Sequence, residues 1–331
     1  MKNYFDTIIS KLLTNRVYLL FTLLVVIMFI LSVLSPYFLN AETLLNITRM
    51  GAVLALVSMG QSLVILAGGA GIDLSVGSIV SLAGVIFGLL IKAGLNIWFA
   101  AGLTVVAGGL LGMVNGITVA WLGLPPLVGT LGTMWIYGAI ALVVTRGIPI
   151  SGFPQEFAFI GDGRVLGIPA QILLVVVPVF LILQVMLSRT YLGRWIYLIG
   201  VNSEAARFSG IPVIWIRFFL YTLSGLLAGL GAIVMASWLM AARPDVGNGL
   251  ELQSITVTVL GGTNIFGGFG SLIGTILAVL IVTLMASGLQ LGGINTIWQL
   301  AVLGFILLGA VALNQFILSR ESKRMGLSTY Q

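Results

Sequence analysis

The stretch LGRWIYLIGVNSEAARFSG, Leu192–Gly210, is a charged interruption in a chain that is otherwise strongly apolar. It carries Arg194, Glu204 and Arg207, and long apolar segments flank it on both sides. Of the 331 residues, 59% are hydrophobic and only 7% are charged. Soluble domains have about 25% charged residues. The composition therefore indicates an integral membrane protein, in which a charged segment of this length needs a partner or a task.

Apolar segments of about 20 residues predict membrane-crossing helices. About ten spans are expected on this measure: Val17–Leu34, Leu44–Ala67, Val76–Ile91, Ile97–Leu122, Leu127–Thr145, Ile172–Leu187, Val213–Met240, Leu252–Leu260, Ser271–Leu289 and Ile297–Phe316. The 43 glycines favour close helix packing and broken helices. The predicted fold is an all-α integral membrane protein: a polytopic bundle of about ten transmembrane helices with Gly-rich breaks, forming one domain over residues 1–331.

The distribution of basic residues predicts the orientation. With an even number of spans on each side of Leu192–Gly210, most of the basic residues fall on one side together with both termini. These are Lys2, Lys11, Arg16, Arg189, Arg194, Arg207, Arg217, Arg320, Lys323 and Arg324. Lys and Arg concentrate in cytoplasmic segments, so both termini and the charged stretch are expected in the cytoplasm.

Several functions are poorly supported by the residues. The chain has no Cys and no His, which removes thiolate metal sites and the usual proton relay near neutral pH. None of its lysines lies in a phosphate-binding loop that ends in Gly-Lys-Ser/Thr. No catalytic constellation and no nucleic-acid groove is visible, so an enzyme is not expected. A transporter built on this chain would therefore be either passive or driven by another chain, and a secondary carrier or facilitator stays open as the alternative.

Two Gly-rich segments resemble each other. GGAGIDLSVGS, Gly68–Ser78, aligns without gaps on GGTNIFGGFGS, which begins at Gly261 and Gly262 and ends at Ser271. The likeness reflects either an internal duplication or shared composition. Asp73 is the acid inside the first segment, and it is expected either to cap the following helix or, less favoured, to contact a substrate.

Polar side chains also occur in or beside apolar spans. Gln61, Asn115, Thr130 and Thr133 are candidates for a polar path for a hydroxyl-rich solute. The alternative is that each makes an interhelical hydrogen bond, worth roughly 1 kcal/mol.

The longest outer segment is expected at Arg146–Pro169. With residues 243–245 it forms a charged rim for a docking protein, or else an ordinary solvated loop. Its candidate residues are Arg146, Glu156, Asp162, Arg164, Arg243 and Asp245.

Five motifs together resemble one family. They are GIDLSVGS (Gly71–Ser78), GMVNG (Gly112–Gly116), PLVGTLGTM (Pro126–Met134), LGRWIYLIGVNSEAARFSGI (Leu192–Ile211) and GNGLELQSITVTVLGGTNIFGGFGS (Gly247–Ser271). In this order they resemble the permease subunits of bacterial ATP-binding-cassette importers for monosaccharides, of the ribose type. The resemblance implies a second permease chain, cytoplasmic ATPase subunits that hold ATP and magnesium, and a periplasmic sugar-binding protein. It implies no cofactor on this chain and a place in the bacterial inner membrane, among lipid and without nucleic acid.

The opening stretch then acquires a role, as a coupling segment over about residues 188–212. Asn202 or Ser203 is expected to cap a short helix with Glu204 in its first turn, and Gly210 and Pro212 are expected to end it. The resemblance implies that this helix docks on the ATPase, and the alternative is a juxtamembrane loop whose arginines reach lipid headgroups. The candidate coupling residues are Asn202, Ser203, Glu204, Ala205, Ala206, Arg207, Phe208 and Gly210.

Overall fold

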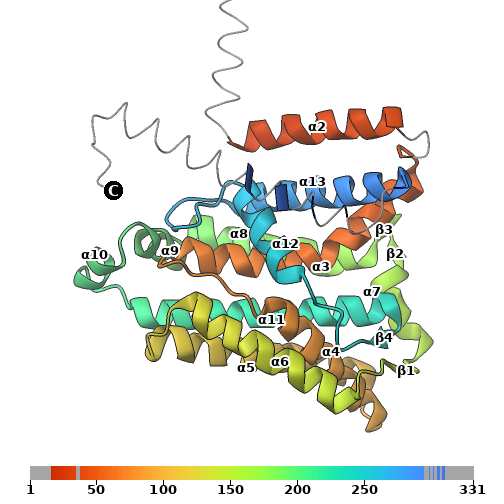
Figure 1. The fold of residues 1–331 in the computed structure, drawn as a ribbon, viewed down its shortest axis with the longest axis horizontal. Coiled ribbons are helices and arrows are strands. Elements are labelled where there is room, and N and C mark those ends of the chain that lie inside the picture. Colours follow the sequence, from red (N-terminus) through yellow and green to blue (C-terminus); the bar gives the residue numbers. More distant parts are fainter. Residues whose placement is uncertain are drawn as a thin grey trace, which may run out of the picture.

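The computed structural model describes residues 16–34 and 38–293, with isolated positions between 298 and 309. Most of its helices run roughly parallel along the long axis of the molecule (Figure 1). The expected span Ile297–Phe316 lies outside the continuously described part. So do the terminal basic residues Lys2, Lys11, Arg320, Lys323 and Arg324.

The elements follow one another in this order. The principal helices are α2 (Arg16–Leu34), α3 (Ala41–Leu66), α4 (Val76–Lys92), α5 (Ile97–Gly116), α6 (Pro126–Thr145), α8 (Val177–Arg189), α11 (Val213–Leu239), α12 (Leu250–Leu260) and α13 (Leu272–Leu291). The π-helical turns η1 (Ile117–Trp121) and η3 (Ile172–Val176) extend α5 and precede α8. Short elements are η2 (Gln155–Phe157), α7 (Ala158–Asp162), α9 (Tyr191–Val201), α10 (Ser203–Phe208), β1 (Ile150–Ser151), β2 (Arg164–Val165), β3 (Ile168–Pro169) and β4 (Ala241–Ala242).

The predicted class, a polytopic helical membrane protein, is confirmed at a coarse level. Within the described residues, 6 helices are long and apolar enough to cross a membrane: α3, α5 with η1, α6, η3 with α8, α11 and α13. The apolar helices at α2, α4 and α12 are shorter. The total of about ten crossings stays a prediction.

Local signals in the sequence explain several helix boundaries. Pro126 opens α6 at a position where its missing N–H costs nothing. The Asn96 side chain accepts hydrogen bonds from the backbone of Trp98, at 3.0 Å, and of Phe99, at 3.4 Å, and so caps α5. Gly210, with φ of +81°, and Pro212 separate α10 from α11.

Helices α3 and α11 form the centre of the bundle, and glycines set how closely α11 approaches α5. A Cβ at Gly112 would meet the Tyr221 carbonyl and lie 2.8 Å from the Gly225 Cα. A Cβ at Gly108 would lie 2.8 Å from the Gly229 Cα. Because no side chain separates the two backbones here, α5 and α11 pack with main chain against main chain, as small residues allow in membrane bundles.

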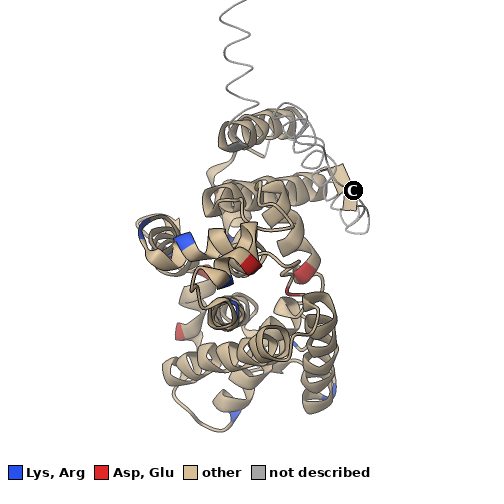
Figure 2. Cartoon of the chain, turned by 90° about the vertical axis from the view of Figure 1, so that its left-hand side faces the viewer, with Lys and Arg blue, Asp and Glu red and all other residues tan. Residues whose placement is uncertain are grey.

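The two ends of the bundle differ in their elements. Helices α9 and α10 lie at the left-hand end in Figure 1, and β1–β4 with α7 lie at the opposite end. We call them the α10 end and the strand end. Strand β1 pairs antiparallel with β4, and β2 pairs with β3. Figure 2 views the α10 end directly and shows charged residues only as isolated positions on a mostly uncharged fold.

Candidate functional site

The predicted polar residues meet around Asp73, in the segment between α3 and α4. The Asp73 side chain is fully buried. Its Oδ1 accepts hydrogen bonds from the Ser75 N–H at 3.0 Å and the Ser75 hydroxyl at 2.7 Å. Its Oδ2 accepts one from the Ser224 hydroxyl, on α11, at 3.3 Å. The Asp73 carboxylate is therefore hydrogen-bonded to Ser75, the residue that precedes α4, and it lies near a helix start, where negative charge is favoured.

A chain of donors leads to this carboxylate from two other helices. The Thr133 hydroxyl of α6 donates to the Asn115 Oδ1 at 2.6 Å. The Asn115 amide of α5 donates to the Ser75 hydroxyl at 2.6 Å, and that hydroxyl donates to Asp73. Every donor points toward the acid, so the series stabilises a negative charge at Asp73.

Two more predicted residues hold the backbone of the same segment. With its nitrogen facing the Asp73 carbonyl, the Gln61 amide donates to that carbonyl at 3.0 Å, and its oxygen accepts from the Asp73 N–H at 3.2 Å. The Thr130 hydroxyl accepts from the Leu74 N–H at 3.1 Å. We refer to Gln61, Asp73, Ser75, Asn115, Thr130, Thr133 and Ser224 as the Asp73 network. It fixes the α3–α4 segment to four helices, α3, α5, α6 and α11.

A second cluster of hydroxyls joins α3 to the other Gly-rich segment. The Ser62 hydroxyl lies 3.1 Å from the Thr258 Oγ1 of α12 and 2.9 Å from the Thr275 Oγ1 of α13. Gly261, which follows α12, allows the close approach of α13, because its Cβ would lie 2.7 Å from the Thr275 nitrogen. Gly262 has a φ of +91°, a conformation that favours glycine. Neighbouring residues of α3 thus contact both regions: Gln61 bonds the first Gly-rich segment, and Ser62 bonds the two helices that flank the second.

Backbone contacts join these two segments directly to α9. The Gly268 N–H donates to the Leu66 carbonyl at 3.0 Å. A Cβ at Gly68 would lie 2.8 Å from the Gly200 Cα of α9, and a Cβ at Gly267 would meet the Gly68 backbone. A Cβ at Gly200 would meet the Leu66 carbonyl and the Gly268 nitrogen. We call this three-way contact the glycine junction.

The coupling segment consists of two helices. Thr190 caps α9, since its hydroxyl accepts from the Gly193 N–H at 3.3 Å. Ile196 and Ile199 are buried, and the Tyr197 hydroxyl donates to the Gly270 carbonyl at 2.9 Å. Helix α9 was not predicted, although Ile196 and Ile199 are spaced by three residues behind a Thr cap, which is a helical signal.

The second helix, α10, follows the predicted pattern. The Asn202 side chain accepts from the Glu204 N–H at 3.0 Å and the Ala205 N–H at 2.9 Å, so Asn202, rather than Ser203, is the cap. Ala206 is buried, whereas the Phe208 side chain is 90% exposed. Glu204 and Arg207 lie in the first and last turns and make no ion pair among the described residues. The helix therefore presents a large apolar side chain and two free charges.

At the strand end, the predicted charged residues pair with one another or with α3. Arg49, which is 9% exposed, binds the Asp162 carboxylate and the Asp162 carbonyl, both at 2.7 Å. Arg164 pairs with Glu42, whose hydrogen bonds raise the pKa of Arg164, and Arg243 pairs with Asp245 at 3.2 Å.

The remaining two candidates of this end lie apart from these pairs. Arg146 ends α6 in the left-handed conformation, with φ of +54°, and Glu156 is exposed in η2. Neither makes an ion pair among the described residues.

Some residues of these sites were not foreseen. Ser75 lies two residues after Asp73, so its Asp-x-Ser pattern was available in the sequence. Ser224 and Arg49 gave no local signal, because their partners are distant in the chain. Within the described residues, no group of three acidic, His or Cys side chains is placed to hold a metal ion.

Comparisons with known proteins show which proteins the chain is similar to. A family model described as branched-chain amino acid transport system / permease component matches residues 43–311. The chain is 38% identical over 294 residues to the ribose import permease protein of Bacillus subtilis (strain 168), covering 88% of this chain and 90% of that one. It is 37% identical over 292 residues to the ribose import permease protein of Escherichia coli (strain K12), covering 87% and 90%.

A third relative carries a different sugar in its name. The D-allose transport system permease protein of Escherichia coli (strain K12) is 38% identical over 299 residues, which cover 90% of this chain and 91% of that one. No solved structure matches the chain.

Proposed function

The chain belongs to the family of branched-chain amino acid transport system permease components, and we propose that it is the membrane-spanning subunit of an ATP-driven importer for a small sugar. It is a multi-pass protein of the inner membrane. The observation that carries the proposal is the identity to ribose and allose permeases, which extends over about nine-tenths of each chain. Transport, rather than catalysis, is the role of this chain, and ATP is hydrolysed on partner subunits.

The coupling segment is the part proposed to bind the ATPase and to be displaced when the ATPase changes conformation. Helix α10 offers the exposed Phe208 ring with Glu204 and Arg207 beside it, so it can place an apolar side chain in a groove and pair charges around it. Its buried Ala206 and its Asn202 cap hold the helix on the bundle. These features support docking on a cytoplasmic subunit more than they support a plain juxtamembrane loop.

The glycine junction is the proposed route from the ATPase to the membrane pathway. A movement of α9 acts directly on Leu66 and Gly268, because Gly200 contacts both backbones. Main-chain contacts transmit displacement with little slack, since no side chain rotates between them. A push on α10 therefore displaces the two Gly-rich segments together.

The Asp73 network is proposed to be the fixed point against which this movement acts. Its members are buried and bonded to one another, so in this conformation they hold the α3–α4 segment rather than face a solute. Gly261 and Gly262 would hold the start of the second Gly-rich segment against α13, through close backbone packing rather than side-chain hydrogen bonds. The sugar path is proposed to run beside these segments, opening when they move.

The strand end is proposed to receive the sugar-binding protein. The two termini and α10 would lie in the cytoplasm, in keeping with the concentration of basic residues there. The exposed charges Arg146, Glu156, Arg164 and Arg243 would then face the periplasm and orient the docking protein. A second permease chain completes the proposed assembly.

Reconstitution tests the function. The chain is placed in liposomes with its ATPase subunits, and sugar-binding protein loaded with labelled ribose or allose is added outside. ATP enclosed with the ATPases should drive accumulation of the labelled sugar, and an ionophore that collapses ion gradients should leave the rate unchanged. Accumulation against a gradient by the chain alone, or loss of uptake with the ionophore, would overturn the proposal in favour of a secondary carrier.

A further inference from the structure

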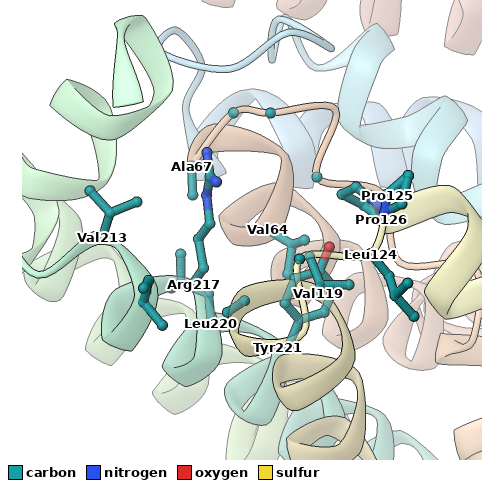
Figure 3. Close-up of a pocket in the computed structure, with 16 residues that line it drawn as sticks. Val64, Ala67, Val119, Leu124, Pro125, Pro126, Val213, Arg217, Leu220 and Tyr221 are labelled. Carbon is teal, nitrogen blue, oxygen red and sulfur yellow. The ribbon is translucent and has the colours of Figure 1, made fainter. Parts of the chain in front are cut away.

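A pocket at the α10 end contains polar groups that the proposed transport role does not use. It has a volume of about 290 Å³ and lies between the end of α3, the turn before α6 and the beginning of α11. Figure 3 shows Arg217 extending along it, past Val213 toward Ala67, with the Tyr221 ring below Val64 and Val119. Its volume is at the lower end of the range for small-molecule sites.

Arg217 has no counter-charge in the part of the chain that the structure describes. No ion pair or hydrogen bond of its guanidinium is found there, and its buried Nε has no partner. Gly69 leaves room for the Arg217 guanidinium, because a Cβ at position 69 would lie 2.8 Å from the Arg217 Nη2. A partly buried guanidinium without an acid is costly, and this cost falls when an anion binds.

The Tyr221 hydroxyl is the second unpartnered group of the same pocket. Tyr221 is 2% exposed, and its buried hydroxyl has no hydrogen-bond partner. Buried tyrosine hydroxyls usually find one. Arg217 and Tyr221 are four residues apart on α11, hence on the same face of the helix, and both line the pocket, so a ligand that fills it lies next to both.

Aromatic side chains mark the depth of the pocket in the membrane. Trp121 stacks on Phe218 with ring centroids 5.3 Å apart, and Trp215 meets Trp121 edge-on at 5.2 Å. Both Trp rings are exposed, and they lie beside pocket residues of η1 and α11. Exposed Trp side chains gather at the level of lipid headgroups. With the α10 end in the cytoplasm, as the proposed function has it, the pocket lies where phosphate groups of the cytoplasmic leaflet are available.

We propose that this pocket binds an anionic phosphate group, held by the Arg217 guanidinium and the Tyr221 hydroxyl. Guanidinium and phosphate form charge-assisted hydrogen bonds, often in pairs. The phosphate comes either from the headgroup of an anionic lipid, which the cytoplasmic leaflet supplies, or from a soluble phosphate. Occupation would brace the start of α11 against the Gly68–Gly69 turn, beside the glycine junction.

The test measures the thermal midpoint of the full chain in an uncharged maltoside detergent, so it does not depend on transport. Phosphatidylglycerol, phosphatidylcholine or inorganic phosphate is titrated, with sodium chloride as the control for ionic strength. Phosphatidylglycerol should raise the midpoint more than phosphatidylcholine. Arg217→Gln should weaken the apparent affinity about tenfold, as the loss of a hydrogen bond to a charged group predicts. Arg194→Gln, which removes an exposed charge at the same end, should leave it unchanged.

Tyr221→Phe provides a second variant that removes only the unpartnered hydroxyl and should fold normally. It should weaken the affinity about threefold while raising the midpoint without ligand, because an unsatisfied buried group is gone. A midpoint shift by inorganic phosphate alone, lost in Arg217→Gln, would identify a soluble ligand and keep the site. Equal responses of wild type, Arg217→Gln and Tyr221→Phe to all three additives would overturn the proposal.

Discussion

The strand end and the α10 end of the bundle differ in how many of their charged side chains form ion pairs. At the strand end, Arg49 reaches Asp162 and Arg164 reaches Glu42, so ion pairs tie the outer segment to α3. At the α10 end, no ion pair involves Arg207 or Arg217 in the part of the chain that the structure describes.

The apolar contacts differ in the same sense. The rings of Phe87 and Phe157 lie 4.9 Å apart beneath the strand-end segment, and the strand pair β1–β4 closes it. At the α10 end, α9 meets the two Gly-rich segments through glycine backbone. The difference indicates that contacts within the chain hold the strand-end segment in place, whereas the α10 end has charges and surfaces that other molecules can complete.

The largest effect is expected at the glycine junction. Gly200→Leu inserts a side chain where the Leu66 carbonyl and Gly268 nitrogen lie, so it should lower the free energy of unfolding by about 1–3 kcal/mol and abolish ATP-driven uptake. The measurements are thermal unfolding in detergent and uptake in liposomes. Gly132→Leu, on α6 with open space around its Cβ, is the control and should leave both intact. A functional Gly200→Leu protein would show that the junction transmits nothing.

The next effect concerns the free charges of α10. Glu204→Arg should leave the protein inserted but reduce sugar uptake about tenfold while the ATPases continue to hydrolyse ATP, as expected when a charge at an interface is reversed. Gly210→Trp should act similarly, since φ of +81° disfavours any side chain there.

The control for these variants is again Gly132→Leu, which changes an exposed position of α6 outside both ends of the bundle and should keep uptake coupled. Normal uptake by both Glu204→Arg and Gly210→Trp would remove the coupling role of α10.

A smaller effect is expected at the strand end itself. Asp162→Ala leaves the buried Arg49 guanidinium with the Asp162 main-chain carbonyl and the Asn46 side chain, so it should cost about 1 kcal/mol after allowance for the exposure of Asp162. Asp245→Ala, in a pair whose two members are half exposed, should cost less than about 0.5 kcal/mol. Chemical denaturation of the two variants in parallel checks the order, and a reversed order would refute this account of the Arg49 pair.

The smallest effect is expected for Arg164→Gln. The pair with Glu42 is exposed to solvent on both sides, so its loss should not move the thermal midpoint measurably at physiological salt. A clear drop of the midpoint would mean that the strand end depends on this pair, and that its exposed charges are structural rather than free to orient a partner.

Hydropathy predicted the long helices well because a membrane leaves few alternatives for apolar segments. The expected span Leu127–Thr145 is α6 within one residue, and Val213–Met240 is α11 within one residue. The cap of α10 was predicted as Asn202 or Ser203, and it is Asn202; capping can be predicted because it depends on neighbouring residues.

Contacts between distant segments were the part that the sequence did not reveal. Gln61 and Asn115 were singled out as polar residues in apolar spans, but their meeting at Asp73 depends on how four helices pack. The same holds for Arg49, whose partner is far along the chain. The glycine junction was unpredictable because glycine carries no side chain by which to recognise its partner.

The glycine junction also constrains the order in which the protein matures. The Leu66 carbonyl receives its hydrogen bond from Gly268, so the first Gly-rich segment stays open at this point until most of the chain has left the ribosome. Until Gly268 has been synthesised, α3 is present but the Leu66 carbonyl at its end lacks its hydrogen-bond donor. Closing so long a loop is slow compared with forming single helices. A nascent chain stalled before Gly268 therefore lacks the hydrogen bond that joins the two Gly-rich segments. Such incompletely folded chains are the species that chaperones bind.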